Sequence, residues 1–334
     1  MLTREEIEQR IAGKDNDLFV EADRTRRKLC GDAVHLRGIV EFSNTCSHNC
    51  FYCGLRRSNT SLPRYRMTQD EILATVSEAD KNGVRTIVLQ SGENDAEQAE
   101  YLAGIIARIK SECDVAVTLC VGVKSPEFYK LWRDAGADRY LLKFETSSPE
   151  LYFRTHVDPD SQLEKRLSAL ACLRTLGYQT GSGCIVGLPG QTCRDLADDI
   201  ILARDLDLDM AAFGPFVPHP NTPLVSSKTG SVALSLRVIA VARLVLGPVH
   251  IAAASALDAV APDGRERALQ CGADVIMANL TPDRYRNLYD IYPSNRGANS
   301  IERIQTVLAR LDRPLAQDHG HSLKKRTEEE ASRC

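Results

Sequence analysis

The sequence has almost no charge imbalance and no unusual composition. Its 42 basic and 45 acidic residues leave a formal net charge of −3 over 334 residues. A nearly neutral chain is not the polycationic kind of protein that binds nucleic acid or a membrane surface by charge alone. With 43% hydrophobic and 26% charged residues, it has the composition of a globular protein, which excludes a disordered chain, a collagen and a coiled coil.

The sequence also lacks a long uninterrupted apolar run. Its longest apolar stretch, residues 238–257, contains Arg243 and His250 and is broken by Gly247 and Pro248, so it predicts a helix followed by a strand rather than a membrane span. The first ten residues are those of a charged surface helix, not of a secretory leader. We therefore expect a cytoplasmic protein without a membrane or nucleic-acid partner. Its eleven cysteines, an odd number, are expected to be thiols or metal ligands rather than disulfides.

One pattern recurs along the chain: an amphipathic helix ends at a glycine, and an apolar strand follows within a few residues. The pattern occurs at Gly83, Gly136, Gly177 and Gly272. Glycine often follows the last turn of a helix, and continuous apolar strands are typical of parallel sheets that are buried on both faces. The sequence predicts eight such strands, at residues 38–42, 86–90, 115–119, 139–144, 180–186, 209–213, 250–254 and 274–278.

Eight strands alternating with helices predict an α/β fold, a (β/α)8 barrel of the TIM type. The alternative is an open doubly wound sheet, but the glycine-rich fingerprint of that fold is absent after the first strand. The predicted organisation is a helical N-terminal extension over residues 1–36, the barrel over 37–295, a C-terminal helix over 296–313 and a charged, solvated tail over 314–334.

Three cysteines directly follow the first predicted strand. Cys46, Cys50 and Cys53 form a Cx3CxxC motif on a loop at the C-terminal face of the barrel, where barrel active sites lie. A zinc site would need a fourth ligand, and although His48 lies within the motif, no second ligand pair is nearby. A four-iron cluster held by three cysteines keeps one iron open to another ligand. Three unrelated cysteines are the remaining interpretation.

This spacing, placed after the first strand of a barrel, resembles the radical S-adenosylmethionine (SAM) superfamily. In that superfamily SAM chelates the open iron, and an electron from the cluster cleaves SAM to methionine and a 5′-deoxyadenosyl radical. Over residues 35–295 the chain is similar to the HydE family of FeFe-hydrogenase maturases, more closely than to biotin synthase or methylornithine synthase. The segments that carry the similarity are IVEFSNTC (39–46), CGLRR (53–57), RYRM (64–67), VLQSGE (88–93), RYLL (139–142), VGLPGQT (186–192) and GPFVPHP (214–220).

The resemblance implies a role for each matching position. One 4Fe-4S cluster would be held by Cys46, Cys50 and Cys53. SAM would be bound by Tyr52 beside the adenine, by Gln90, by Ser91, Gly92 and Glu93 at the amino group, by Glu145 at the ribose and by Arg166 at the carboxylate. The substrate would lie deeper in the barrel, near Thr118, Lys143, Met277, Tyr289 and Tyr292.

Simpler interpretations of these residues stay open. Arg166 and Glu145 also fit surface ion pairs, and Lys143 also fits an ion pair with Glu145 on the same strand face. Thr118 and Met277 fit a barrel core, while Tyr289 and Tyr292 fit one face of a helix. Cys120 and Cys184 follow strands toward the same end of the barrel, which is where biotin synthase binds an auxiliary cluster. Ser91 stands where a further thiol would be needed, and residues 291–296 contain no cysteine, so we predict a single cluster.

The activity implied by the resemblance is assembly of the di-iron subcluster of the hydrogenase H-cluster. The 5′-deoxyadenosyl radical would act on a small organometallic substrate, an iron carbonyl cyanide species with a cysteine ligand. An electron donor such as ferredoxin or flavodoxin and the other hydrogenase maturases are the expected protein partners. One alternative is a radical SAM mutase or sulfur-insertion enzyme on the same scaffold, and another is a non-catalytic iron–sulfur carrier or scaffold.

Overall fold

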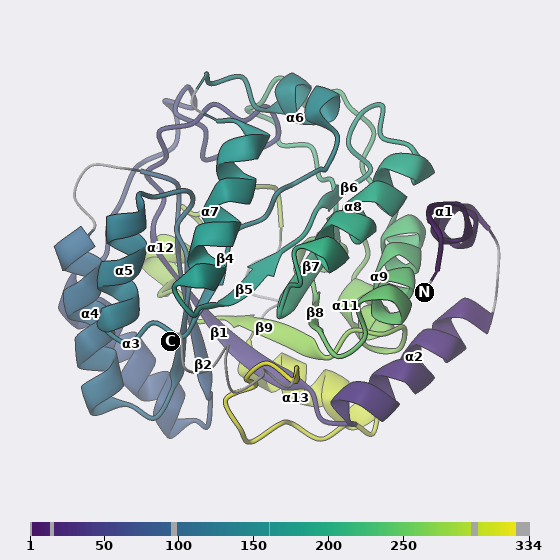
Figure 1. The fold of residues 1–334 in the computed structure, drawn as a ribbon. Helices are drawn as coiled ribbons and strands as arrows, with labels where there is room; N and C mark the ends of the chain where they lie inside the picture. Colours follow the sequence, from purple (N-terminus) through teal and green to yellow (C-terminus); the bar gives the residue numbers. More distant parts are fainter. Residues whose placement is uncertain (1, 14–16, 95–98, 160, 295–299, 325–334) are drawn as a thin grey trace.

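Eight parallel strands form a closed barrel in the computed structural model, which describes residues 2–13, 17–94, 99–159, 161–294 and 300–324 (Figure 1). Each strand pairs with its successor, and the ring closes where β5 pairs with β7 and β9 pairs with β1. The strands of the ring are β1 (His35–Ser43), β2 (Thr86–Ser91), β3 (Ala116–Cys120), β4 (Arg139–Leu141), β5 (Gln179–Ser182), β7 (Met210–Pro215), β8 (His250–Ala253) and β9 (Val275–Asn279). The predicted barrel is confirmed, and the open sheet is wrong.

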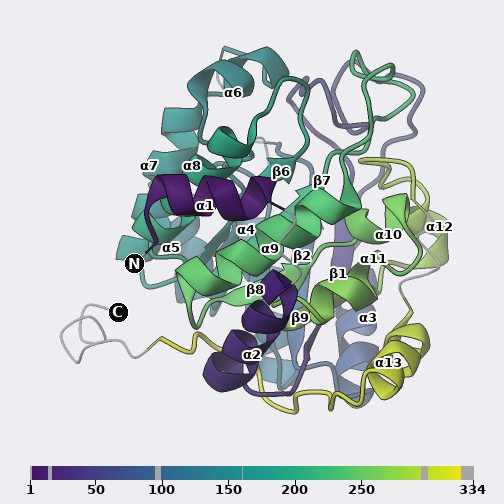
Figure 2. The same cartoon turned by 90° about the vertical axis from the view of Figure 1, so that its right-hand side faces the viewer.

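Helices surround the ring on its outside and at its two ends (Figures 1 and 2). They are α3 (Gln69–Lys81), α4 (Ala99–Glu112), α5 (Pro126–Asp134), α6 (Pro149–Thr155), α7 (Leu163–Thr175), α8 (Cys193–Asp205), α9 (Val232–Leu246), α10 (Ala256–Val260), α11 (Gly264–Leu269), α12 (Asp283–Arg286) and α13 (Ile301–Arg310). Helix α3 begins at a capping box, in which Thr68 and Glu71 satisfy each other's backbone N–H groups. In the described part of the chain, no helix is both long and apolar enough to span a bilayer.

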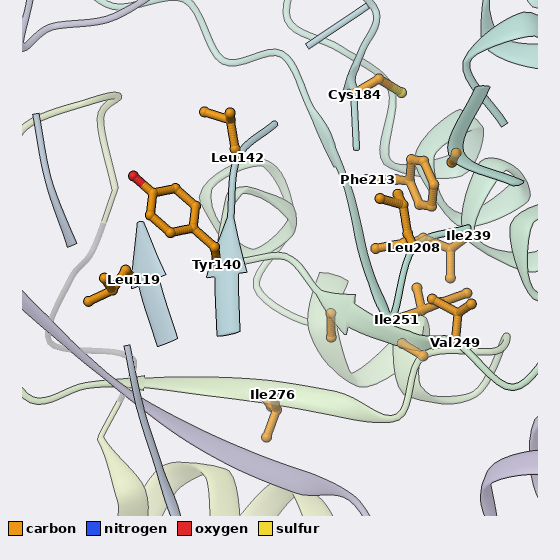
Figure 3. Close-up of a cluster of buried hydrophobic side chains, with 14 of the residues drawn as sticks. Leu119, Tyr140, Leu142, Cys184, Leu208, Phe213, Ile239, Val249, Ile251 and Ile276 are labelled. Carbon is orange, nitrogen blue, oxygen red and sulfur yellow. The ribbon is translucent and has the colours of Figure 1, made fainter. Parts of the chain in front are cut away.

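Two N-terminal helices extend the layer of covering helices. Helix α1 (Arg4–Ala12) packs on α8, and α2 (Asp17–Cys30) packs on α9 (Figure 2). Figure 3 shows how the strands meet this layer: Phe213 of β7 and Ile251 of β8 lie against Ile239 of α9. All three side chains are fully buried, and each such burial contributes roughly 1.5–3 kcal/mol.

The fifth predicted strand is divided in two. The expected strand at 180–186 consists of β5, a break, and β6 (Ile185–Val186), which pairs with β7 at the rim of the barrel. The break lies at Gly183, whose φ of 152° is in the region that favours glycine, and a Cβ there would lie 2.0 Å from the Ala212 carbonyl oxygen. The chain therefore bends at a position that only glycine can occupy.

The described part of the C-terminal tail differs from the solvated segment predicted for 314–334. Residues 314–324 run across the N-terminal ends of the strands, where Arg139 donates to the His319 carbonyl oxygen at 2.6 Å. His250 Nε2 lies 3.0 Å from the His321 carbonyl oxygen, and Ser322 donates to Asp209. Polar side chains at the strand ends hold this segment, which we call the C-terminal strap. Residues 325–334, and residues 296–299 of the predicted C-terminal helix, lie outside the described residues.

Candidate active site

The three motif cysteines lie on the loop that follows β1, at the C-terminal end of the barrel. The loop is tied to the neighbouring strand end because Ser47 N–H donates to the Glu93 carbonyl oxygen at 2.7 Å. It is tied to α6 because Phe51 N–H donates to the Thr155 carbonyl oxygen at 2.9 Å. All three thiols are partly buried. The sequence therefore places the whole Cx3CxxC motif in one fixed loop at the working end of the barrel.

The pKa values of the three thiols are raised, so these thiols need a positively charged partner in order to ionise. Burial and the neighbouring thiols raise the pKa of Cys50 well above its usual value and that of Cys53 to about 12, and burial raises that of Cys46. An iron–sulfur cluster supplies that positive partner, since metal binding deprotonates its cysteine ligands. Among the described residues, no three histidine, cysteine or carboxylate side chains converge on one metal-ion position. A four-iron cube does not need three ligands at one position, because each cysteine binds a different iron.

Gly92 leaves no room for a side chain beside the cysteine loop. A Cβ at this position would lie 2.4 Å from the Thr45 carbonyl oxygen and 2.8 Å from Cys46 Cβ. A similar restriction holds at Gly122, where a Cβ would lie within 2.4 Å of the Glu93 carboxyl group. The two glycines let the ends of β1, β2 and β3 pack closely around Glu93.

Glu93 and Arg166 form an ion pair next to the cysteines. Arg166 Nη2 lies 3.1 Å from Glu93 Oε2, and His48 Nε2 lies 3.2 Å from Glu93 Oε1. Burial disfavours the charged carboxylate, but Arg166 and His48 outweigh it and lower the pKa of Glu93 to about 2. The glutamate therefore stays ionised at every physiological pH.

Arg166 is held in place from three sides. It lies in the first turn of α7, with only 11% of its side chain exposed. Its Nε donates to Tyr152 OH at 2.9 Å and its Nη1 to the Lys143 carbonyl oxygen at 3.0 Å. This burial and bonding exclude the exposed surface ion pair that the sequence left open for Arg166.

Tyr52 is positioned by two other aromatic rings. Its hydroxyl donates to His156 Nε2 at 2.8 Å, because His156 Nδ1 points at the Tyr152 carbonyl oxygen. The His156 ring stacks on Tyr152 with centroids 3.9 Å apart. Burial and the nearby Arg166 charge lower the pKa of His156 to about 3, so this histidine is neutral.

Lys143 and Glu145 form an ion pair with each other, with Lys143 Nζ 3.0 Å from Glu145 Oε2. Glu145 adopts a φ of 68°, which is uncommon for a residue other than glycine. The conformation is fixed by a backbone bridge, in which Glu145 N–H donates to the Gly183 carbonyl oxygen at 3.0 Å and Ile185 N–H donates to the Glu145 carbonyl oxygen at 2.9 Å. Strain of this kind is often found at functional sites.

Apart from Lys143, the predicted substrate residues separate into two pairs. Tyr289 is buried near the cysteines, and Gln90 Nε2 donates to its hydroxyl at 3.2 Å. Tyr292 is half-buried three residues later, and both tyrosines lie beyond α12, so the helix-face interpretation is wrong. Thr118 and Met277 line a small cavity inside the barrel, and Thr118 Oγ1 has no hydrogen-bond partner among the described residues.

Two site residues have no role in the sequence-based assignment. Arg37 lines the same cavity as Thr118; it is 3% exposed, and its Nε and Nη2 lack hydrogen-bond partners within the described ranges. Burial and the charge of Arg139 lower its pKa to about 9. The sequence signal that could have identified Arg37 is a charged residue at a position of β1 that faces the inside of the barrel. His48 contacts Glu93, and its position inside the cysteine motif was the signal there.

Cys120 and Cys184, the two further thiols that the sequence places toward this end of the barrel, occupy separate positions. Cys120 ends β3, and burial followed by the charge of Glu145 raises its pKa to about 12. Cys184 is fully buried in the bend after β5 (Figure 3). Its thiol hydrogen-bonds with Asp199. An unligated, protonated thiol suits both positions, and the single cluster stays a prediction.

Comparison with known proteins agrees with this fold. The model of the Radical SAM superfamily matches residues 40–203. The FeFe hydrogenase maturase subunit HydE of Thermotoga maritima is 47% identical over 295 residues, which cover 87% of this chain and 84% of that protein. Biotin synthase 2 of Corynebacterium diphtheriae is 27% identical over 279 residues, covering 82% and 83%. The crystal structure of methylornithine synthase (PylB) has the same fold, with a TM-score of 0.84, 24% sequence identity and 95% of each chain covered.

The match to HydE extends well beyond the residues that the superfamily model covers and spans most of both chains. The chain therefore belongs to the radical SAM superfamily and, within it, to the HydE family of FeFe-hydrogenase maturases.

Proposed function

We propose that this protein binds one 4Fe-4S cluster and SAM at the C-terminal end of its barrel and acts on a cysteine-ligated iron carbonyl cyanide species during assembly of the hydrogenase di-iron subcluster. The observation that carries the proposal is the Glu93–Arg166 ion pair beside the three-cysteine loop. SAM presents an ammonium and a carboxylate on one carbon. A buried carboxylate and a buried guanidinium 3.1 Å apart offer the complementary pair.

The residues of the chain hold and orient the bound groups. Cys46, Cys50 and Cys53 would ligate the cluster; the cluster supplies one electron and SAM supplies the adenosyl radical. On SAM binding, Glu93 would exchange its contact with Arg166 for the ammonium, and Arg166 would turn to the carboxylate. Tyr52, fixed by His156, offers a flat ring to the adenine. The closed barrel keeps water from the radical.

Two cations support an anionic substrate. Lys143 lies at the rim, where its partner Glu145 is the predicted ribose contact, so SAM binding would compete for that carboxylate. Arg37 lies deeper, with two guanidinium nitrogens on the cavity wall that have no partner among the described residues. Its Nη1 donates to Met210 Sδ at 2.7 Å, so the guanidinium is only partly satisfied; this is costly for a buried cation, and an anion in the cavity would relieve that cost.

The test measures methionine released from SAM by the anaerobically reconstituted, reduced protein. Release should depend on the synthetic iron–carbonyl–cyanide–cysteine complex and should not be supported by dethiobiotin or lysine. Release supported by dethiobiotin would favour a sulfur-insertion enzyme, and release supported by lysine a mutase. No SAM cleavage with any compound would favour the non-catalytic carrier. Partnership with the other maturases is a further part of this proposal.

A further inference from the structure

The loop that carries the cysteines is basic, whereas the protein as a whole is slightly acidic. From Phe42 to Gln69 the sequence contains no aspartate or glutamate but four arginines, Arg56, Arg57, Arg64 and Arg66. The whole chain has a formal net charge of −3, so this loop differs in charge from the chain as a whole. Arg57 is the clearest case, because 64% of its side chain is exposed and its nearest carboxylate, Asp158, is only 14% exposed.

Exposed apolar side chains lie beside this loop, on and after α6. Phe153 is 79% exposed, the largest value among the exposed large apolar residues of the described chain, and Val157 is 42% exposed. Between them in the sequence, the Thr155 carbonyl oxygen accepts the hydrogen bond from Phe51 N–H, next to Cys50. The exposed ring is therefore two residues from a direct contact with the cysteine loop.

Arg154 adds a second exposed cation to the same short helix. Its side chain is 54% exposed, and its partner Glu150 is 3.8 Å away and 83% exposed, so this pair is solvated and weak. Figures 1 and 2 both place α6 at the end of the barrel where the loop after β1 emerges. We call the surface formed by Arg57, Phe153, Arg154 and Val157 the carrier patch.

We propose that the carrier patch is the docking surface for a small acidic one-electron carrier protein. This inference rests on the proposed function, because each SAM cleavage consumes one electron that the chain itself cannot supply. The carrier gives up one electron and the four-iron group gains it, while no bond to the chain forms or breaks. Electron-transfer encounters bury little surface, so an exposed ring with a rim of two arginines is large enough.

The chemistry of the patch selects this partner. Aromatic residues and arginine are enriched at protein interfaces, and a positive rim steers an acidic partner by its long-range field. Ferredoxins and flavodoxins have that chemistry. A second copy of this chain is a poorer fit at this surface, because the basic loop would face itself across a symmetric contact.

The experiment compares two electron sources for SAM cleavage by the reconstituted protein, with the synthetic iron–carbonyl–cyanide–cysteine complex present in every reaction. One source is dithionite; the other is a purified flavodoxin or a purified ferredoxin, each with its reductase and NADPH. The variants are Arg57→Glu and Phe153→Ala, singly and together. The matched control is Arg310→Glu on α13; the Arg310 side chain is 59% exposed, and α13 lies at the opposite end of the molecule from α6 (Figure 2).

The double variant should lower carrier-driven cleavage about tenfold at subsaturating carrier, with dithionite-driven cleavage unchanged. Added salt should slow the carrier-driven reaction of the wild-type protein but not that of the double variant. The proposal is overturned if carrier-driven and dithionite-driven rates fall together, if Arg310→Glu has the same effect, or if dithionite supports cleavage but neither carrier does. A self-association that Phe153→Ala abolishes would also overturn it. Absence of dithionite-driven cleavage in the wild-type protein would instead contradict the proposed function on which it rests.

Discussion

Arg166 Nη2 and Glu93 Oε2 are 3.1 Å apart, although 73 residues separate them in the sequence. Neither side chain can readily turn to water in place of the other, because both are nearly nine-tenths buried. The charge of Arg166 is also the largest of the effects that lower the pKa of Glu93. In our account this pair opens to receive the amino acid part of SAM.

Arg166→Ala should weaken SAM binding while the cluster stays intact. Truncating one partner of a desolvated guanidinium–carboxylate pair costs about 2 to 5 kcal/mol, which is roughly 30-fold or more in Kd. The exposed Arg57→Ala is the matched control and should change SAM affinity by less than about 1 kcal/mol. Binding is measured by calorimetry on the reconstituted protein. Equal SAM affinity in Arg166→Ala and wild type would leave Arg166 with a structural role only.

Iron content tests the cluster assignment. Reconstituted protein should contain about four irons per chain, and Cys50→Ala should lose both the cluster absorption and SAM cleavage, because three thiols are the minimum ligand set. Cys172→Ala, on the outer helix α7, should retain both. About eight irons per chain, or an intact cluster in Cys50→Ala, would show that the single three-cysteine site is wrong.

His156 should make the stability of the protein depend on pH. Its folded-state pKa is about 3 against an ordinary 6.5, so between these values the unfolded chain binds a proton that the folded chain excludes. Stability is therefore complete above pH 6.5 and falls as the pH is lowered, by up to about 1.4 kcal/mol per pH unit. The free energy of unfolding of the apoprotein, measured with denaturant at several pH values, should change less steeply with pH in His156→Gln than in the wild type. Equal slopes in the two proteins would mean that His156 is protonated in the folded state.

Much of the fold could be predicted from the sequence, because helix-ending glycines and apolar strands are local signals. The bend at Gly183 could not, since the reason for its φ of 152° is the Ala212 carbonyl on a neighbouring strand. The cysteine motif is local too, whereas the contact of Glu93 with Arg166 depends on how the barrel closes. Arg37 was missed because its significance comes from the cavity it lines, not from its neighbours in sequence.

The C-terminal strap illustrates the same limit. Its charged and polar composition is that of a solvated tail, yet it supplies the carbonyl oxygen of His319 to the fully buried Arg139. Ending the chain after Pro314 should destabilise the protein by about 1 to 3 kcal/mol, because Arg139 Nη2 would lose its acceptor in the strap, although Nε and Nη1 would keep Gln179 and Thr86. Ending it after Lys324 keeps these contacts and should have little effect. Equal unfolding midpoints for the two truncated proteins would show that the strap does not stabilise the barrel.

Within the proposed function, we expect the 5′-deoxyadenosyl radical to attack the sulfur of the cysteine-ligated iron species. The most direct measurement is electron paramagnetic resonance of the reduced, reconstituted protein mixed with SAM and the synthetic iron–carbonyl–cyanide–cysteine complex carrying isotope-labelled cysteine. We expect a paramagnetic product in which hyperfine coupling places the 5′-deoxyadenosyl group on the cysteine sulfur. A signal without coupling to labelled cysteine, or no signal while dethiobiotin or lysine is turned over, would contradict the substrate assignment and leave only the radical SAM chemistry standing.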